Sequence, residues 1–209
     1  MRIVETEAMD AYADARLTAD EFLEWMAGPS APEGRWELVA GVPVRMMVNV
    51  RWGHSAVVGN LMRHLGNDLA GKPGRAHAES FGVKTREDGA RFPDVLVSCK
   101  KERDRDVGAR DTRVVIEVLS DGTRTFDKSQ KLEEYQRVST IQHIVFIEAG
   151  IVDVNHFVRA AEGWRRVDLD QFEDVLELSA VDASVGLKDI YEDLDVPPPG
   201  PRLRVVRDE

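Results

Sequence analysis

A short apolar run that contains one carboxylate constrains the fold of this chain more than any other feature. The run is residues 114–119, with the sequence VVIEVL, and Glu117 is its only polar member. A run of this length and composition is typical of a buried β-strand. A carboxylate inside such a strand costs several kcal/mol of desolvation unless it is paired or bound to a cation. The run therefore predicts a strand whose acid has a partner.

A second apolar run, residues 92–97 with the sequence FPDVLV, has the same form and contains Asp94. Neighbouring strands lie about 4.8 Å apart, so two such acids can converge on one hard cation. Oxygen ligands suit Mg²⁺ or Mn²⁺, which can activate a water molecule and stabilise charge on a phosphodiester. Alternatively, each acid lies at a strand end, solvated or paired with an arginine such as Arg91 or Arg113. The presence of both acids, followed by a helix that carries lysine, favours the metal site.

Hydrophobic periodicity and turn residues predict helices and strands along the rest of the chain. The clearest helix is residues 54–70, where one apolar stripe includes Leu61, Leu65 and Leu69. The other expected elements are a helix opened by the capping box of Thr18 and Glu21, a hairpin over 35–39 and 42–48, strands over 75–80, 81–86, 92–99 and 142–148, a helix that begins at Asp127 and ends near Val138, a hairpin over 151–158 and 164–169, and a short helix near 187–194.

The order of these elements predicts a single α/β domain over residues 17–195. No internal repeat or linker divides it, and the polar residues 100–113 are expected to form an exposed loop. Residues 1–16 show no clear period and are expected to be a loose lead-in. The proline-rich residues 196–209 are expected to be a tail, because proline disrupts the interior of helices and sheets.

Composition excludes several classes of protein. The acids near the N-terminus stand where a signal peptide needs positive charge, and no apolar stretch reaches the about 18 residues of a membrane helix. Cys99 is the single cysteine, so an internal disulfide and a cysteine-rich metal site are both excluded. A soluble, cytoplasmic protein without a membrane partner is expected.

The net charge of −10 argues against a protein that coats nucleic acid without specificity. The charge is uneven, however. Residues 84–137 hold 13 Lys and Arg against 12 Asp and Glu, which leaves 15 against 26, or −11, for the remainder. The near-neutral segment carries both acid-bearing runs. The region whose charge tolerates a polyanion is therefore also the region that would contact it. A solvated surface loop of mixed charge explains the same count equally well.

The two acid-bearing strands resemble the core of PD-(D/E)XK nucleases, and the chain more narrowly resembles the restriction endonucleases of the Uma-two family. The order and spacing of the matching pieces carry this resemblance over about residues 17–195. The pieces are Phe22 and Leu23, residues 32–41, His54, residues 92–95, residues 115–120 with Thr123, Asp127, Lys131, Leu132 and Tyr135, the strand that ends in Glu148, and residues 178–187 with Tyr191. The resemblance implies a restriction-endonuclease-like mixed central β-sheet flanked by helices, divalent-metal chemistry on nucleic acid, and a homodimer.

Individual residues match positions of the family. Glu37 matches the first acid, and because it alternates with Trp36 and Leu38 it should face the opposite way from them, toward a site if the hairpin abuts the sheet. An exposed residue on an edge hairpin is an equal alternative for Glu37. His54 is expected to bind nucleic acid through a phosphate or to hydrogen-bond an acid, although a histidine at a helix start is often a surface residue. The remaining histidines lack the spacing of zinc ligands, which argues against a zinc site.

One position departs from the nuclease pattern, which places a lysine two residues after the second acid. That position is Leu119 here, and the resemblance instead assigns the charge-stabilising role to Lys131 in the next helix. Asp121 and Gly122 also differ from the proline and small residue that the family often carries. The alternative is a solvated Lys131 that pairs with Glu133 or Glu134.

The leading functional prediction is a metal-dependent endonuclease that hydrolyses phosphodiester bonds in DNA. Its metal ligands are Asp94, Glu117 and Glu37, and its charge stabiliser is Lys131. The alternative is a non-catalytic nucleic-acid- or protein-binding member of the same fold, whose acids are structural. A homodimer is expected from the resemblance and from the apolar hairpin over residues 151–164, which one small sheet would not fully cover.

Overall fold

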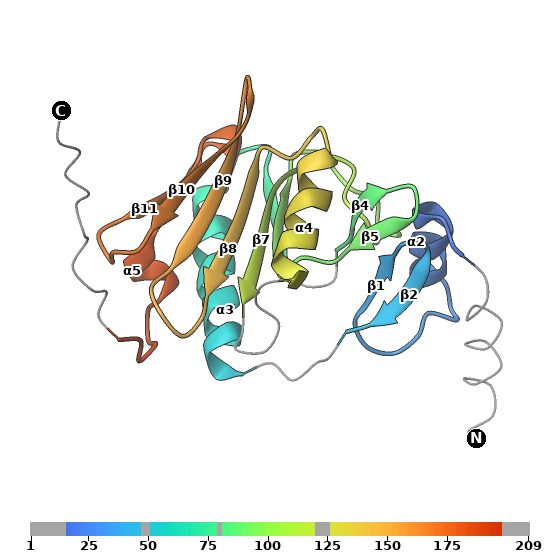
Figure 1. The fold of residues 1–209 in the computed structure, drawn as a ribbon, viewed down its shortest axis with the longest axis horizontal. Helices are drawn as coiled ribbons and strands as arrows, with labels where there is room; N and C mark the ends of the chain where they lie inside the picture. The colour runs from blue at the N-terminus through green and yellow to red at the C-terminus, as the bar shows by residue number, and fades with distance from the viewer. Residues whose placement is uncertain (1–15, 47–50, 79–80, 120–125, 198–209) are drawn as a thin grey trace.

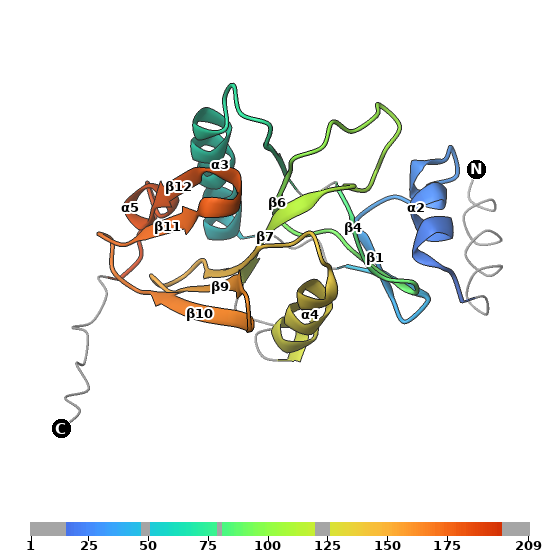
Figure 2. The ribbon, with the colours of Figure 1, turned by 90° about the horizontal axis from the view of Figure 1, so that it is seen from above.

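The two larger of the three β-sheets among the described residues lie side by side, with helices packed against them (Figure 1, Figure 2). The computed structural model describes residues 16–46, 51–78, 81–119 and 126–197. The helices are α2 (Ala19–Ala27), α3 (Trp52–Asp68), α4 (Phe126–Arg137) and α5 (Leu187–Ile190), with a 3₁₀ turn at Ser179–Val181. The strands are β1 (Trp36–Val39), β2 (Val42–Arg45), β3 (Arg75–Ala78), β4 (Val83–Arg86), β5 (Gly89–Arg91), β6 (Val95–Ser98), β7 (Thr112–Leu119), β8 (His143–Glu148), β9 (Val154–Ala160), β10 (Gly163–Leu169), β11 (Val175–Leu178) and β12 (Ala183–Gly186).

The larger sheet has six strands in the order β10-β9-β8-β7-β6-β3. β7 and β8 run parallel, with α4 between them in the chain, whereas the other neighbouring pairs are antiparallel. Figure 2 shows α3 on one face of this sheet and α4 on the opposite face. The mixed sheet flanked by helices confirms the predicted fold class. Because both faces of β7 are covered, residues 114–119 of this strand are apolar except for Glu117, instead of alternating with polar residues.

Side chains of β7 alternate between the two covering helices. Ile116 and Val118 belong to the core on the α3 side. Val115 is buried in the core on the α4 side, where Leu119 packs against it. Glu117 has the same parity as Val115 and Leu119, so its carboxylate faces α4.

The predicted long helix is confirmed as α3, which begins two residues earlier than expected, at Trp52. Its Leu61 and Leu65 are fully buried, and Leu69, directly after the helix, is 2% exposed. All three pack in the core on the α3 side. The predicted stripe therefore anchors α3 to the larger sheet.

The smaller sheet has the order β2-β1-β5-β4, and α2 covers one of its faces. Ala40 and Gly41 connect β1 to β2 with φ angles of 50° and 82°, which a two-residue hairpin turn requires. The capping box of α2 is present, because Glu21 N donates to Thr18 Oγ1 and Thr18 N donates to a carboxylate oxygen of Glu21. Trp36 and Leu38 are buried with Phe22 of α2, so Glu37, which lies between them in β1, faces away from this helix.

Several predicted boundaries need correction. Asp94 lies in a bend one residue before β6, not inside a strand that begins at residue 92, because residues 92–94 connect one sheet to the other. β5 was not expected. The C-terminal helix ends at Ile190, and the preceding hairpin of β11 and β12 was missed, because its few apolar residues gave no extended period. α4 includes Asp127, whose side chain lies outside the described residues.

The apolar hairpin over residues 151–164 contributes to the core of its own chain. Val152 and Val154 are 6% and 0% exposed, while Phe157 and Trp164 pack against the core on the α4 side. Ile151 remains 48% exposed. This hairpin therefore gives little support to the expected homodimer, which stays a prediction.

Among the described helices, none combines the length and apolar character that crossing a membrane requires. Residues 1–15 and 198–209 lie outside the described residues, so the predicted lead-in and tail are essentially untested.

Candidate active site

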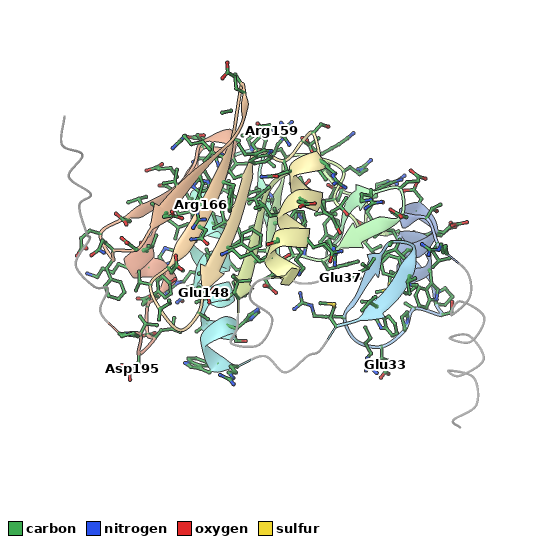
Figure 3. All side chains as sticks on the ribbon, viewed as in Figure 1. Glu33, Glu37, Glu148, Arg159, Arg166 and Asp195 are labelled. Carbon is green, nitrogen blue, oxygen red and sulfur yellow. The ribbon has the colours of Figure 1, made fainter. Side chains whose placement is uncertain are left out.

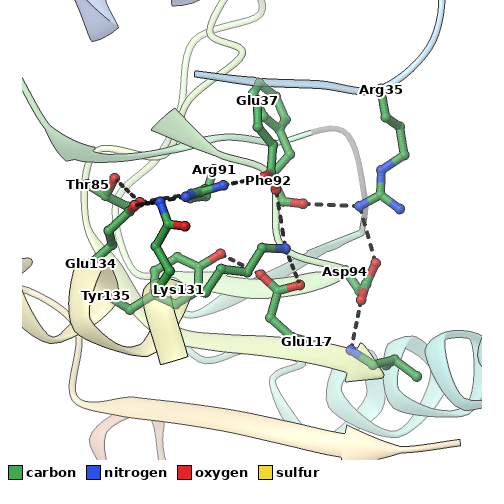
Figure 4. Close-up of polar contacts among 12 residues, drawn as sticks. Arg35, Glu37, Thr85, Arg91, Phe92, Asp94, Glu117, Lys131, Glu134 and Tyr135 are labelled. Atoms are coloured by element: carbon green, nitrogen blue, oxygen red, sulfur yellow. Dashed lines mark hydrogen bonds and ion pairs between the residues drawn. The ribbon is translucent and has the colours of Figure 1, made fainter. Parts of the chain in front are cut away.

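Three carboxylates and one ammonium gather where the chain passes from the smaller sheet into the larger one (Figure 4). Glu37 lies in β1, Asp94 directly before β6, Glu117 in β7 and Lys131 in α4. All four residues are buried, with exposed fractions between 2% and 7%. Buried charges are costly unless they are paired, so the contacts among these groups decide what the site can do.

Asp94 and Glu117 stand at facing positions on adjacent segments. Val95 pairs with Ile116 in the antiparallel ladder of β6 and β7, and one further step of this register sets residue 94 opposite residue 117. The amide of Val118 donates a 2.8 Å hydrogen bond to Oδ2 of Asp94, which holds this carboxylate against β7. The register therefore places the two acids opposite one another on adjacent segments, although Asp94 itself is not part of the strand.

An arginine and a histidine accompany Asp94. Nη2 of Arg35 lies 3.2 Å from Oδ1, and Nε2 of His54, in the first turn of α3, lies 3.3 Å from Oδ2. Burial raises the pKa of Asp94, but the contacts with His54, the Val118 amide and Arg35 outweigh it and lower the pKa below its usual value. Asp94 is therefore held as a carboxylate.

Glu117 has a different electrostatic environment. The Tyr135 hydroxyl donates a 2.6 Å hydrogen bond to Oε1, and Nζ of Lys131 lies 3.1 Å from Oε2. Burial is the largest cause that raises the pKa of Glu117 to about 7; Lys131 opposes the rise, and the charges of Asp94 and Glu37 add to it. Burial and the charge of Glu117 likewise raise the pKa of Tyr135, so its hydroxyl stays protonated.

Glu37 is buried between β1 and α4, as Figure 3 and Figure 4 show, and is not exposed on an edge hairpin. Its Oε1 lies 3.3 Å from Nζ of Lys131, and its Oε2 accepts a 2.6 Å hydrogen bond from Nη1 of Arg91. Arg91 also donates to both carboxylate oxygens of Glu134, at 2.8 Å each. Lys131 thus bridges Glu37 and Glu117, while Arg91 ties Glu37 to α4.

A family model described as "Uma2: Putative restriction endonuclease" matches residues 19–188. The chain belongs to the Uma2 family. The match spans 170 of the 209 residues and includes every residue of the site described above. It confirms the resemblance that the ordered motifs indicated.

The fold has a counterpart among solved structures. The chain is similar to a protein from Anabaena variabilis ATCC 29413 described as "a putative nuclease belonging to DUF820", with a TM-score of 0.64 and 17% sequence identity. The similarity covers 84% of this chain and 97% of the other. At this level of identity the likeness shows a shared fold. No curated protein matches the chain.

Four residues of this Uma2 site were not assigned a role from the sequence. Arg35 stands near a strand end, where arginine is common, so its position gave no signal. Arg91 was considered as a partner of Asp94 or Glu117, but it pairs with Glu37 and Glu134. Tyr135 lies four residues after Lys131 on α4, and this spacing already made them neighbours on one helix face. Glu134 was considered as a surface partner of Lys131, but it is 6% exposed and pairs with Arg91.

The charges of this Uma2 site nearly balance without a bound ion. Four carboxylates (Glu37, Asp94, Glu117 and Glu134) face three permanent cations (Arg35, Arg91 and Lys131), so the carboxylates exceed these cations by one. Among the described residues, no three His, Cys, Asp or Glu side chains form a group that could hold a metal ion. A ready-made cage of three protein ligands is therefore not present there.

Proposed function

We propose that this protein is an endonuclease that hydrolyses phosphodiester bonds in DNA and depends on Mg²⁺ or Mn²⁺. The observation that carries the proposal is the facing pair of Asp94 and Glu117 with Nζ of Lys131 3.1 Å from Glu117. Membership of the family described as "Putative restriction endonuclease" supports the same function.

The donor chemistry of the site fits a hard divalent cation. The two facing acids supply oxygen ligands. Burial, and to a smaller extent the charges of Asp94 and Glu37, raises the pKa of Glu117, and a bound cation would oppose this rise. Mg²⁺ commonly binds through one or two carboxylates and keeps several waters, so a cage of three protein ligands is not required. We therefore assign Asp94 and Glu117 as the ligands. When bound, the ion would polarise a phosphoryl oxygen and lower the pKa of a coordinated water.

Lys131 supplies a positive charge beside the reacting phosphate. Its ammonium is buried and held by two carboxylates, so its position is fixed before substrate arrives. A preorganised charge in a site of low dielectric stabilises developing negative charge more than a mobile one in water does. We propose that Lys131 opposes the charge that develops on the scissile phosphate.

Glu37 is proposed to position Lys131, and the metal-ligand role that its family position predicts is not assigned to it. Both of its oxygens already contact cations, one of them Arg91 at 2.6 Å. These contacts favour a role in which Glu37 keeps the ammonium of Lys131 directed at Glu117. His54, which contacts Asp94, is proposed to orient that acid and to bind a substrate phosphate.

A second candidate function is a non-catalytic module that binds nucleic acid or protein. It is favoured by the near balance of charge at the site, because each acid named above already contacts a cation of the same chain. Under this alternative the network is structural, and the fold would gain no stability from a divalent ion.

Thermal melting under titration with Mn²⁺ tests the metal site and separates the two candidates. A ligand that binds only the folded protein raises its melting temperature by mass action. The nuclease proposal expects a concentration-dependent rise for the wild-type protein and a loss of this rise in Glu117→Gln. A melting temperature that Mn²⁺ leaves unchanged, together with no cleavage of DNA, would support the non-catalytic alternative.

A further inference from the structure

The first turn of α3 presents backbone donors next to the candidate active site. The first hydrogen bond in this turn runs from Ser55 N to Arg51 O, so the N–H groups of Trp52, Gly53 and His54 precede the helical ladder. Arg51 occupies the N-cap and makes no side-chain cap, and the first turn contains no acidic residue. The positive end of the helix dipole is therefore uncompensated by side chains of this turn, an environment that favours an anion.

A buried polar atom in the same turn independently indicates a ligand. The side chain of His54 is only 9% exposed, and its Nδ1 atom makes no hydrogen bond within the described part of the chain. The other ring nitrogen, Nε2, contacts Asp94. A phosphate oxygen beside Nδ1 would give this buried atom the hydrogen-bond partner that the described residues do not supply.

Trp52 adds a surface for a base at the same place. It is 72% exposed, more than any other large hydrophobic side chain among the described residues. Trp52 and His54 are two residues apart on the helix, so they point to different sides of it, one toward solvent and one toward Asp94. An exposed indole beside phosphate-binding groups is the arrangement that single-strand-binding proteins use for stacking.

The first turn of α3 lies close to the carboxylates of the candidate active site. Gly53 packs near Ala149, the residue after β8, and Figure 1 shows the start of α3 beyond the ends of β7 and β8. Glu117 lies near the end of β7, and Asp94 is in contact with His54. A phosphate at the start of α3 would thus lie next to the carboxylates that we assign to the metal.

We propose that the first turn of α3 is a nucleotide subsite, where the N–H groups of residues 52–54 hold a phosphate and Trp52 stacks on an unpaired base. This inference rests on the proposed nuclease function and deepens it, because it names a strand with unpaired bases as the substrate. Paired bases are already stacked within a duplex, so the indole would gain little from intact double-stranded DNA.

Equilibrium binding of a fluorescent single-stranded oligonucleotide in EDTA tests the stacking part without any cleavage. Trp52→Ala should weaken binding by roughly 5- to 150-fold, the range for loss of one stacked base, and Trp52→Phe should retain most of the affinity. Val175→Ala, an exposed apolar residue in β11, is the matched control and should bind like the wild type. A duplex of the same sequence should respond less to Trp52→Ala.

Two substitutions of Arg51 test the phosphate-binding amides. Arg51→Ala and Arg51→Asn both remove one positive charge, but only asparagine can accept hydrogen bonds from the N-terminal amides. We expect Arg51→Asn to melt at a higher temperature than Arg51→Ala and yet to bind the single strand several-fold more weakly. Because the weaker binder is the more stable protein, this result cannot come from unfolding.

The outcomes separate this inference from the proposed function. Trp52-dependent binding of the single strand without Mn²⁺-supported cleavage would uphold the subsite and refute the nuclease. Cleavage that is unaffected by Trp52→Ala, with unchanged single-strand affinity, would refute the subsite and leave the nuclease standing. No binding of the single strand by the wild type, or equal affinity of the Arg51→Ala and Arg51→Asn proteins, would also overturn the subsite as described.

Discussion

The ammonium of Lys131 lies 3.1 Å from Oε2 of Glu117, so a helix supplies a lysine to an acid in the sheet. The nuclease pattern places this lysine two residues after the acid, where the chain has Leu119. Leu119 packs against the core on the α4 side. α4 follows β7 in the chain and covers the face from which Glu117 projects, so a lysine on its first turns reaches the carboxylate.

This contact predicts that Lys131→Ala lowers the rate of DNA cleavage by about 10²-fold or more, as for other lost electrostatic stabilisers. The matched control is Lys128→Ala on the same helix, because Lys128 instead contacts Asn155 and the ring of Phe146. Rates are compared in a Mn²⁺-supported nuclease assay. Equal activity of the two variants would contradict the role assigned to Lys131.

The pKa of Glu117 predicts how Glu117→Gln changes stability with pH in the absence of metal. A pKa of about 7 in the folded protein, above the ordinary 4.5, means that the folded state retains a proton which the unfolded state has lost. Glu117 therefore reduces the free energy of unfolding progressively as the pH rises from about 4.5 to 7. The melting temperature of Glu117→Gln minus that of the wild type should increase between pH 5 and pH 8. A difference that stays constant would refute the buried, proton-retaining carboxyl.

A buried histidine pair outside the site predicts an opposite dependence on pH. Nδ1 of His143 lies 2.9 Å from Nε2 of His156, and the Ala180 amide donates to Nε2 of His143. Burial lowers the pKa of each histidine to about 4, and for His156 the charge of His143 contributes further. The folded state therefore binds fewer protons than the unfolded state between about pH 6.5 and pH 4, and stability falls as the pH decreases through this range.

Because Glu117 acts in the opposite direction over part of the same range, the histidine effect is measured as a difference between proteins. His156→Gln should lose less stability than the wild type between pH 6.5 and pH 4, in urea unfolding at each pH. Identical slopes for both proteins would show that the pair does not resist protonation.

The packing of α3 predicts a cavity effect at Leu65. This side chain is fully buried between α3 and the larger sheet, so Leu65→Ala should lower the free energy of unfolding by about 2–5 kcal/mol. Val175→Ala, at a position that is 42% exposed, is the control and should have a much smaller effect. Denaturant unfolding measures both. A Leu65→Ala protein as stable as the wild type would mean that the stripe does not anchor the helix.

The sequence predicted the parts of the fold that leave a local pattern. Glu117 stood out because it interrupts an apolar run, and α3 because its leucines recur with helical spacing. The position of Lys131 depended on the family resemblance, since a lysine on a helix is ordinarily exposed. Whether Glu37 faces a site or solvent was left undecided. The alternation of side chains along its strand gave the direction in which Glu37 points, but not which residues lie on that side.

Contacts between distant segments could not be read in the same way. Arg91 and Glu134 are 43 residues apart, and neither breaks a strong pattern, so nothing local marked their pairing. The pairing depends on how β5 of the smaller sheet meets α4 of the larger one. The same holds for Arg35 and Asp94, which are 59 residues apart and meet only because the two sheets adjoin.

The most direct test of the central claim is the rate of DNA cleavage as a function of Mn²⁺ concentration, measured for the wild type, Asp94→Asn and Glu117→Gln. The account predicts a wild-type rate that rises with Mn²⁺ and saturates, that is abolished by EDTA, and that is lost in both variants while their folds persist. It would be contradicted by a wild-type protein that cleaves neither single- nor double-stranded DNA at any Mn²⁺ concentration, or by cleavage that both variants retain.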